Sequence, residues 1–347
     1  MAKEHAQHTI NMLKGLDMDK IMLSHGGGGE EMNELINGLI FKIFNNDILK
    51  DSNDSAILNL NNKVAFSTDS FVVTPIKFKG GDIGKIAVCG TVNDLAMVGA
   101  SAKYLSCSLI LEEGFGLDEL KDILNSIKKT ADEAGVSIVC GDTKVVPKGS
   151  CDKIFINTTG IGEIITDQIE VKNLEVCAKI LLSGDIGRHG AVILASREEL
   201  ALTSELESDC KVLKSVVLEL LNSGIKPFCM RDATRGGLSA VLNEWANFKN
   251  YEIKIYEEKI ALSDEVVGIC ELLGFEAYEL ANEGTFVLAV DPKDEQKALE
   301  VLRKYDKNAN IIGEVVSDKR AGVLLENSYG GNRYLEPPKG ELLPRIC

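Results

Sequence analysis

The chain alternates short apolar runs with glycine-rich polar turns. Short apolar runs between turn residues predict strands, and longer stretches with apolar residues three or four apart predict helices. The strands predicted in the first half lie at 56–60, 64–73, 104–111, 136–140 and 154–162. Asn61-Asn62 is the expected turn of a hairpin between the first two.

Helical spacing predicts a helix over 86–99. Its residues are small and apolar, so we expect it to pack tightly against a sheet. A second, amphipathic helix follows Gly116 and ends near Gly135. A further helix begins at Glu30, with acidic residues in its first turn.

The second half begins near residue 170 and repeats the order of strand, glycine-rich turn and helix. Ile180–Ala191 and Met230–Leu238 both have this pattern, and the second of them opens a helix through Trp245. A strand over 286–290 precedes an exposed helix over 294–304. We therefore predict two α+β domains, joined near 165–175.

The last twelve residues, 336–347, contain three prolines and end in Cys347. Proline fixes φ and removes a backbone donor, so this segment is neither a helix nor a central strand. Extended, it would reach on the order of 40 Å. A thiol on such an arm can be loaded in one place and processed in another. A frayed tail that happens to end in cysteine is equally consistent with position alone.

Composition narrows the possible functions. A chain of 347 residues suggests two domains. The net charge of -15, without a Lys/Arg-rich run, argues against nucleic-acid binding but not against nucleotides that arrive with Mg²⁺. No apolar run approaches a membrane span, and the N-terminus lacks the apolar core of a signal peptide. Nine scattered cysteines without a CxxC pair predict a reduced, cytoplasmic protein.

Several polar residues interrupt apolar elements. Asn93-Asp94 lies inside the predicted helix, where burial is costly unless the pair is bonded or holds a metal. Asp142 and Lys144 follow a strand, where a solvated turn is equally consistent. The four glycines at 26–29 offer free amides to phosphate, or form a linker. Glu283 occupies the turn before a strand.

His189 lies in the glycine-rich turn of Ile180–Ala191. This turn, at a helix N-terminus, would suit an anion. A lone histidine there is more often structural or a surface residue.

Five motifs resemble the ATP-using superfamily of aminoimidazole ribonucleotide synthetase, selenophosphate synthetase and thiamine monophosphate kinase. They are Asn53-Asp54-Ser55-Ala56, Thr68-Asp69, Asn93-Asp94-Leu95-Ala96-Met97, Gly141-Asp142-Thr143 and Asp232-Ala233-Thr234-Arg235-Gly236-Gly237-Leu238. One small departure is Ser55, where the superfamily more often has alanine.

The tail sequence Pro344-Arg345-Ile346-Cys347 narrows the resemblance. Together with Gly80–Lys85 and Val88-Cys89-Gly90-Thr91, it resembles the HypE family of NiFe-hydrogenase maturation factors. The resemblance implies an α+β fold of two α/β-sandwich domains of the aminoimidazole ribonucleotide synthetase type, plus a mobile tail. The implied division is a glycine-rich segment 1–37, an ATP-binding domain 38–168, a C-terminal domain 169–333 and the tail 334–347.

The same resemblance implies an activity. A partner, HypF, loads a carbamoyl group onto Cys347, and the enzyme dehydrates the resulting thiocarboxamide to a thiocyanate with ATP and Mg²⁺. The cyanide then passes to the hydrogenase iron on a HypC–HypD complex. A homodimer is also implied.

Residue roles follow from the resemblance as well. Cys347 is the carrier, and Glu283 and Lys144 resemble an acid–base pair beside it. The carboxylates that resemble Mg²⁺–ATP ligands are Asp54, Asp69, Asp94 and Asp142. The expected phosphate contacts are Asn93, Lys85 and the glycine loop, including Gly27 and Gly28.

Two alternatives remain open at this point. A selenophosphate-synthetase-like kinase would need a cysteine near the N-terminus, but the first cysteine is Cys89. A non-catalytic cysteine carrier or assembly scaffold would leave the four separated aspartates without a purpose. Comparing the rate of ATP hydrolysis by the protein with a carbamoylated tail and by the unmodified protein distinguishes these alternatives.

Overall fold

The computed structural model describes residues 20–26, 30–46, 48, 58, 60–61, 63–197, 204–338 and 345–347. These residues form two large sheets, of four and seven strands, and a small two-stranded one. Within the described ranges, no helix is both long and apolar enough to cross a membrane.

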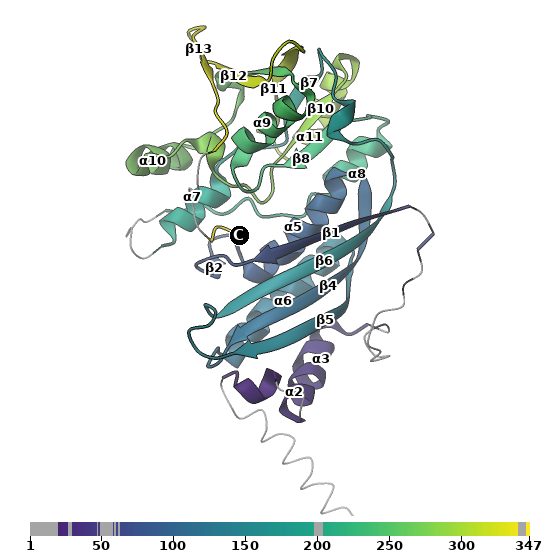
Figure 1. The fold of residues 1–347 in the computed structure, drawn as a ribbon, viewed down its shortest axis with the longest axis vertical. Helices are drawn as coiled ribbons and strands as arrows, with labels where there is room; N and C mark the ends of the chain where they lie inside the picture. Colours follow the sequence, from purple (N-terminus) through teal and green to yellow (C-terminus); the bar gives the residue numbers. More distant parts are fainter. Residues whose placement is uncertain are drawn as a thin grey trace, which may run out of the picture.

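The four-stranded sheet belongs to the N-terminal domain and has the order β1-β6-β4-β5. Its strands are β1 (Val64–Phe71), β4 (Ala100–Glu112), β5 (Ser137–Val146) and β6 (Ile154–Ile164). β4 and β5 are parallel, and the other pairs are antiparallel. α5 (Ile83–Met97) and α6 (Leu117–Ala134) lie on one face, and the described elements leave the other face uncovered (Figure 1).

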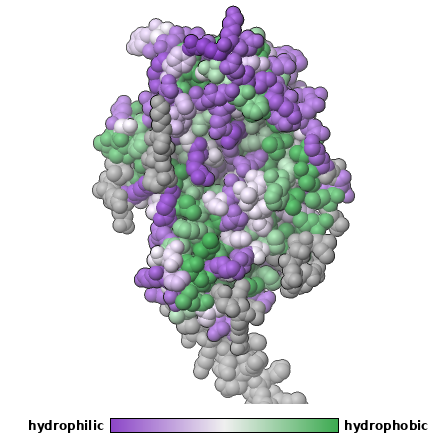
Figure 2. Space-filling view, viewed as in Figure 1, coloured by the Kyte–Doolittle hydropathy of each residue, from purple (hydrophilic) through white to green (hydrophobic). Residues whose placement is uncertain are grey.

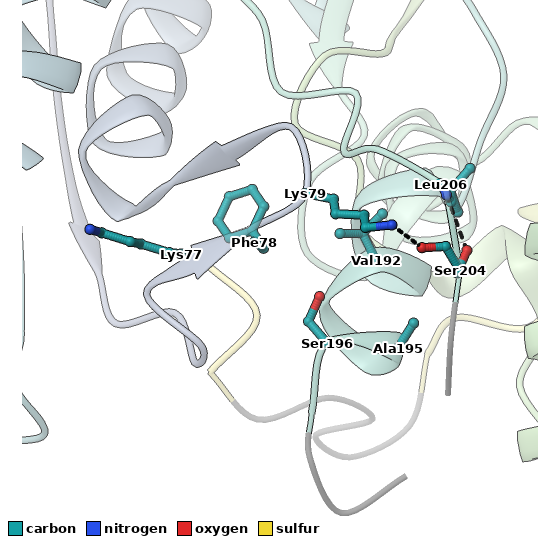
Figure 3. Close-up of a pocket in the computed structure, with 8 residues that line it drawn as sticks. All are labelled: Lys77, Phe78, Lys79, Val192, Ala195, Ser196, Ser204 and Leu206. Atoms are coloured by element: carbon teal, nitrogen blue, oxygen red, sulfur yellow. Dashed lines mark hydrogen bonds between the residues drawn. The ribbon is translucent and has the colours of Figure 1, made fainter. Parts of the chain in front are cut away.

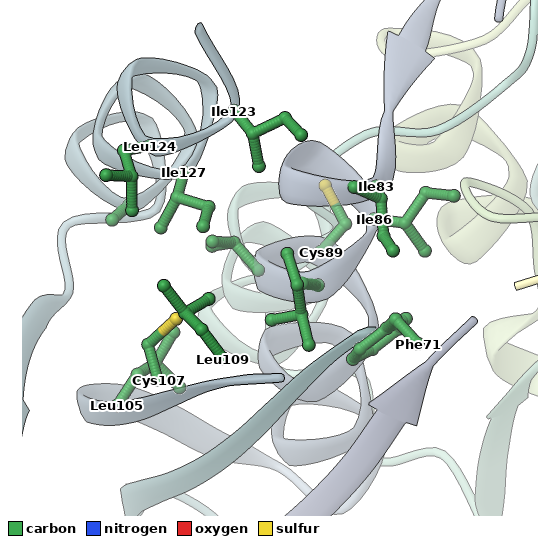
Figure 4. Close-up of a cluster of buried hydrophobic side chains, with 14 of the residues drawn as sticks. Phe71, Ile83, Ile86, Cys89, Leu105, Cys107, Leu109, Ile123, Leu124 and Ile127 are labelled. Carbon is green, nitrogen blue, oxygen red and sulfur yellow. The ribbon is translucent and has the colours of Figure 1, made fainter. Parts of the chain in front are cut away.

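The core of this domain contains one helix that is apolar on one side, α6, and one that is apolar on nearly all sides, α5. α6 buries Leu120, Ile123, Leu124 and Ile127, which lie three or four residues apart on one side. α5 is different, because 13 of its 15 residues are buried. It lies between the sheet, α6 and the C-terminal domain, and this explains why its sequence is small and apolar on all sides (Figure 4).

The seven-stranded sheet belongs to the C-terminal domain and has the order β13-β12-β9-β11-β7-β10-β8. In chain order its strands are β7 (Lys179–Leu182), β8 (Cys229–Asp232), β9 (Glu252–Tyr256), β10 (Phe286–Val290), β11 (Asn310–Ser317), β12 (Gly322–Glu326) and β13 (Asn332–Tyr334). Only the pair β12–β9 is parallel.

Helices cover both faces of this second sheet. Trp245 of α9 (Gly237–Lys249) is at the centre of one apolar cluster, and α8 (Lys214–Asn222) and α11 (Glu295–Arg303) contribute to the other. α7 (Arg188–Ala195) and α10 (Asp264–Leu273) pack together at the side that faces the N-terminal domain (Figure 1).

The remaining elements are short. They are η1 (Leu23–Gly26), α2 (Glu30–Leu35), the π-helix η2 (Ile36–Ile40), α3 (Phe41–Phe44), β2 (Lys77–Phe78), β3 (Gly81–Asp82) and the 3₁₀ turns η3 (Val171–Asn173), η5 (Glu257–Lys259), η6 (Ala277–Glu279) and η7 (Pro292–Asp294).

Most of the predicted elements are confirmed, with one informative error. β5 continues to Val146, so the predicted end of this strand at residue 140 was wrong. After a bulge, Gly141–Val146 pairs with Cys107–Glu112 of β4, and these ladder bonds extend the strand. Most of the predicted strand 56–60 lies outside the described residues. α9 runs past Trp245 to Lys249. The predicted domain limits stay predictions, although residues 165–178 do connect the two sheets.

The tail is bonded to the body at both of its described ends. Ser239 and Asn243 of α9 donate to the carbonyls of Glu336 and Leu335, at 2.7 and 2.9 Å. The last three residues, 345–347, lie between the two domains, where the chain end is marked in Figure 1. Residues 339–344 lie outside the described ranges.

Deleting Pro344–Cys347 should leave the fold intact and lower the free energy of unfolding by about 1–3 kcal/mol, since one buried aliphatic side chain, Ile346, is lost. Urea unfolding followed by circular dichroism checks this. A truncated protein without native secondary structure would mean that the tail is part of the core.

Candidate active site

The last residues of the tail pair with the chain just after β1. The amide of Val72 donates to the Cys347 carbonyl at 3.1 Å, and the amide of Thr74 donates to the Arg345 carbonyl at 3.1 Å. Two bonds spaced two residues apart on both chains are those of an antiparallel strand pair. Ile346, between them, is 5% exposed. The tail therefore docks inward, beside the chain that follows β1.

Arg345 fixes the entrance of the docked tail. Its Nε donates to the Val72 carbonyl at 2.8 Å, and its Nη1 donates to the Asp152 carboxylate at 2.6 Å. The guanidinium lies 5.6 Å from the centre of the Phe155 ring. Simultaneous contacts to a carbonyl, a carboxylate and a ring need a planar group with several donors, which a lysine lacks.

The docked thiol of Cys347 lies near enough to the carboxyl of Glu283 to be affected by its charge. Burial, and then the nearby Glu283, raise the pKa of the Cys347 thiol to about 12, against a smaller effect of Arg235. Burial also raises the pKa of Glu283 well above its usual value, followed by repulsion from Cys210 and Asp232. At neutral pH the docked thiol is therefore protonated, and Glu283 holds a proton more strongly than an exposed carboxyl does.

The backbone around Glu283 is held by a single carboxylate. Asp209 accepts from the amides of Glu283 and Gly284 with its two oxygens, at 3.1 and 2.9 Å. A Cβ on Gly284 would lie 1.8 Å from the Asp209 carbonyl, so only glycine fits. The Glu283 side chain is 2% exposed, and its Oε1 has no hydrogen-bond partner among the described residues. This oxygen is free to meet a group carried on the tail.

Asp69 of β1 and Asp94 of α5 form a carboxylate pair beside the tail. Burial raises the pKa of Asp94 to about 6, with repulsion from Asp69 as the next cause. Ser67 donates to Asp94 at 2.7 Å, and Thr91 donates to Asp69 at 3.1 Å. Asp69 also acts electrostatically on Cys347 and Glu283. The pair is therefore half-buried and lies near the thiol.

Asp232, at the end of β8, is a third carboxylate near the thiol. Burial and then Asp94 raise its pKa to about 7. Its Oδ2 is buried and lacks a hydrogen-bond partner within the described part of the chain. A buried carboxylate without a partner is costly, and a cation or a donor on a ligand would relieve the cost.

Asp69 and Asp94 suit a Mg²⁺ ion that binds together with a nucleotide, but not one held by the protein alone. No three His, Cys, Asp or Glu side chains of the described residues form a ready metal-binding group. Mg²⁺ usually takes only one or two carboxylates and completes its shell with water and substrate phosphates. The crowded pair Asp69 and Asp94 therefore fits Mg²⁺ that arrives with a nucleotide.

Asp142 and Lys144 lie elsewhere within one copy of the chain. Both are exposed on β5, and they form an ion pair of 3.0 Å with each other. Thr143, between them, is buried, so its two neighbours point to the uncovered face of the sheet. Asp69 points the other way, toward Thr91 of α5. A single copy thus separates Asp142 from Asp69 and Asp94.

Asn93 and Lys85 are engaged by the protein itself. The Asn93 amide donates to the Lys211 carbonyl at 3.1 Å and accepts from the Leu213 amide at 2.8 Å. The Lys85 ammonium donates to the Gly80 carbonyl at 2.8 Å. Three of the other predicted ligands, Asp54, Gly27 and Gly28, lie outside the described residues.

A cavity of about 540 Å³ lies next to the docked tail (Figure 3). Lys77, Phe78 and Lys79 line it from the N-terminal domain, and Val192 and Ala195 of α7 line it from the C-terminal domain. The Phe78 ring also packs edge-on against His189, with the ring centres 5.3 Å apart. The cavity and the tail therefore share a wall.

Sequence reasoning missed three residues of the site: Asp209, Asp232 and Arg235. Asp232 and Arg235 lie in a motif that follows a strand and opens a helix, and this context is a usable signal. Asp209 lies in an irregular segment without periodicity, and nothing local distinguishes it. His189 was considered, but it was interpreted as a structural or surface residue.

The comparisons with known proteins agree with this architecture. Residues 52–164 match the family model of the AIR synthase related protein, N-terminal domain, and residues 178–326 match that of its C-terminal domain. Thiamine monophosphate kinase from Aquifex aeolicus, at 19% identity and a TM-score of 0.58, shares the fold. The class is thus the two-domain AIR synthase related proteins.

More specific relatives cover nearly the whole chain. Carbamoyl dehydratase HypE of Escherichia coli K12 is 45% identical over 340 residues, which is 95% of this chain and 100% of that protein. The HypE of Rhodobacter capsulatus is 40% identical over 335 residues, 95% of this chain and 98% of that protein. A crystal structure of HypE in complex with ATP matches with a TM-score of 0.91 and 42% identity, over 94% of this chain and 99% of the other. The chain belongs to the HypE family.

The raised pKa of Asp94 should make the free energy of unfolding of the nucleotide-free protein depend on pH. An unfolded aspartate has a pKa of about 3.9. Because the pKa of folded Asp94 is about 6, its bound proton stabilises the fold fully below about pH 4, and this stability is lost as pH rises through 6. Between these limits the wild type should lose about 1–3 kcal/mol relative to Asp94→Asn.

Urea unfolding of both proteins in chelator-containing buffer, from acid to neutral pH, measures that difference. A difference that does not vary with pH would show that Asp94 is not crowded.

Proposed function

We propose that this protein is an ATP-dependent carbamoyl dehydratase that converts a carbamoylated Cys347 to a thiocyanate. The observation that carries this proposal is the docking of the Cys347 thiol against the buried Glu283, in the same space as Asp69, Asp94 and Asp232. A relative is named carbamoyl dehydratase, and another was crystallised with ATP.

The reaction removes water from an amide. The thiocarboxamide and ATP give the thiocyanate, ADP and phosphate, so the carbamoyl oxygen leaves on the phosphate. Amide oxygen is a poor leaving group, and transfer of a phosphoryl group to it makes it a good one. The carbamoyl nitrogen loses its two protons as the triple bond forms.

Each residue would have one task. Cys347 carries the carbamoyl group. Glu283 would take a proton from nitrogen, since a raised pKa makes its ionised form a stronger base. Asp69 and Asp94, with Asp54, would hold Mg²⁺, which neutralises phosphate charge. Arg235 acts electrostatically on the thiol and is suited to the departing phosphate.

Docking and loading would occur at different places. A thiol with a pKa near 12 is a poor nucleophile, so the docked Cys347 cannot attack a carbamoyl donor efficiently. The tail must leave its groove to be loaded. HypF would be the loading partner, because a relative was crystallised as a HypE–HypF complex with a TM-score of 0.76 over 88% of this chain. A HypC–HypD iron scaffold would receive the cyanide.

A homodimer would complete the nucleotide site. Hydrophobic residues gather over the uncovered face of the four-stranded sheet, and Val64, Phe66 and Ile110 are exposed there (Figure 2). Asp142 and Lys144 point to the same face. We infer that a second copy covers this face and brings its own Asp142 and Lys144 toward the first copy's site. All nine cysteines are free thiols, in keeping with a cytoplasmic location.

Asp94→Ala and Asp142→Ala should each weaken Mg²⁺–ATP binding about tenfold or more, since a contact to a charged group contributes about 1.5–3 kcal/mol. Isothermal titration calorimetry measures this, with unchanged circular dichroism. Asp82 is unsuitable as a control because its side chain caps α5. Asp318→Ala, in an exposed turn, is a better one. Native affinity in both variants would remove the metal role from these aspartates.

Cys347→Ala should accept no carbamoyl group, whereas Glu283→Gln should be loaded and then accumulate as the thiocarboxamide. A general base typically contributes roughly 10²–10⁴-fold, so water loss should slow by about that factor. Mass spectrometry of the tail peptide follows both steps. If Glu283→Gln lost water at the native rate, another group, with Lys144 tested next, would be the base.

A further inference from the structure

His189, in the first turn of α7, contacts the tail directly. Its Nε2 lies 2.8 Å from the carbonyl oxygen of Ile346, and its Nδ1 lies 2.8 Å from the hydroxyl of Ser208. The imidazole is 0% exposed. Both ring nitrogens are therefore bonded, and one of them is bonded to the residue before Cys347.

The partners of His189 determine which nitrogen carries the proton. A carbonyl only accepts, so Nε2 must donate to Ile346. The Ser208 hydroxyl already accepts from the Cys210 amide at 3.1 Å, so its own hydrogen can be donated to Nδ1. Burial lowers the pKa of His189, which agrees with a neutral ring. Ser208 thus selects the tautomer that can bind the tail.

His189 and Glu283 are held by one piece of backbone. The Asn282 side chain accepts from the Gly187 amide at 2.6 Å, at the start of α7. The Gly190 amide donates to the Ala281 carbonyl at 2.9 Å. Residues 281–282 therefore fix the first turn of α7 and lie directly before Glu283. This short segment sets the distance between His189 and Glu283.

The docked tail needs a contact that fixes its register, that is, which tail residue lies beside Glu283. The two main-chain bonds to Val72 and Thr74 specify the register of the tail only weakly, and the Arg345 side chain fixes only the outer end of the docked residues. A slip by two residues would keep similar backbone bonds but move the thiol far from Glu283. A donor fixed beside Glu283 and aimed at one carbonyl removes that ambiguity.

We propose that His189 is a positioning residue that sets the register of the docked tail by binding the Ile346 carbonyl, so that the group on Cys347 meets Glu283. This proposal rests on the proposed dehydration for its consequence in catalysis, but the docking itself does not depend on ATP or on carbamoylation. Ser208 acts through His189.

Three variants of the full-length protein test the proposal. His189→Phe keeps a ring against Phe78 and removes both nitrogens. His189→Gln keeps a donor near the position of Nε2. Ser208→Ala leaves the ring but removes the group that selects its tautomer. Ser196→Ala, at the C-terminal end of the same helix and outside the tail contacts, is the matched control.

The first measurement is the alkylation rate of Cys347 by iodoacetamide, read by mass spectrometry of the tail peptide with the exposed Cys177 as internal reference. His189→Phe should raise the rate at Cys347 about 2–10-fold, as expected for the loss of one hydrogen bond. Ser208→Ala should raise it less, and His189→Gln should restore it toward the wild-type value. An unchanged ratio in His189→Phe would overturn the proposal.

The second measurement is single-turnover water loss after carbamoylation of Cys347 with potassium cyanate. His189→Phe should slow water loss by a similar factor, while cyanate loads Cys347 as fast as in the wild type or faster. A variant that only misfolds would also expose Cys210 to alkylation. If Cys347 in the wild type is never dehydrated but the alkylation pattern holds, then the proposed function fails and the docking role stands.

Discussion

The site depends on the hydrogen bonds made by residues 208–213, which connect both domains. Asp209 holds the amides of Glu283 and Gly284 in the C-terminal domain, and Asn93 of α5 binds the backbone of Lys211 and Leu213. Ser208 orients His189 against the tail. One irregular segment therefore fixes Glu283, the helix that carries Asp94, and the docked tail. An irregular chain can do this because its backbone groups are not used by a sheet or a helix.

Around this segment the fold brings together more negative charge than it neutralises. Asp69, Asp94, Asp232 and Glu283 lie near one another, and the pKa of Asp94, Asp232 and Glu283 is raised. Burying carboxylates in this way costs stability in the free protein. A cation bound to a nucleotide would reverse this loss of stability. The same carboxylates would therefore destabilise the free protein and provide affinity for the nucleotide. Asn93, by contrast, has hydrogen-bond partners within the protein, and its bonds to Lys211 and Leu213 stabilise the contact between the two domains.

The sequence predicted most of the fold because its strands and helices have clear periods and are bounded by glycine. It also named Cys347, Glu283 and Asp94 as candidate site residues, and the structure brings them near one another, while their roles stay predictions. The error at the end of β5 arose because this strand is extended by pairing with β4, a non-local interaction that no local pattern reports. The same reason explains Asp209 and His189, since their roles come from contacts with residues 74 and 157 positions away. Local sequence could not distinguish Asp142, on the uncovered face, from Asp69 on the opposite one.

The pairing between the tail and Val72–Thr74 also has a consequence for solubility. While the tail is docked, the backbone groups that follow β1 are covered. Each time the tail leaves, the amides of Val72 and Thr74 become a short open sheet edge, next to a groove that had held Ile346. Open edges invite pairing with other chains and self-association. Under the proposed function, the tail is thus both the carrier of the carbamoyl group and the cover of these backbone groups, and a short time outside the docked position limits their exposure.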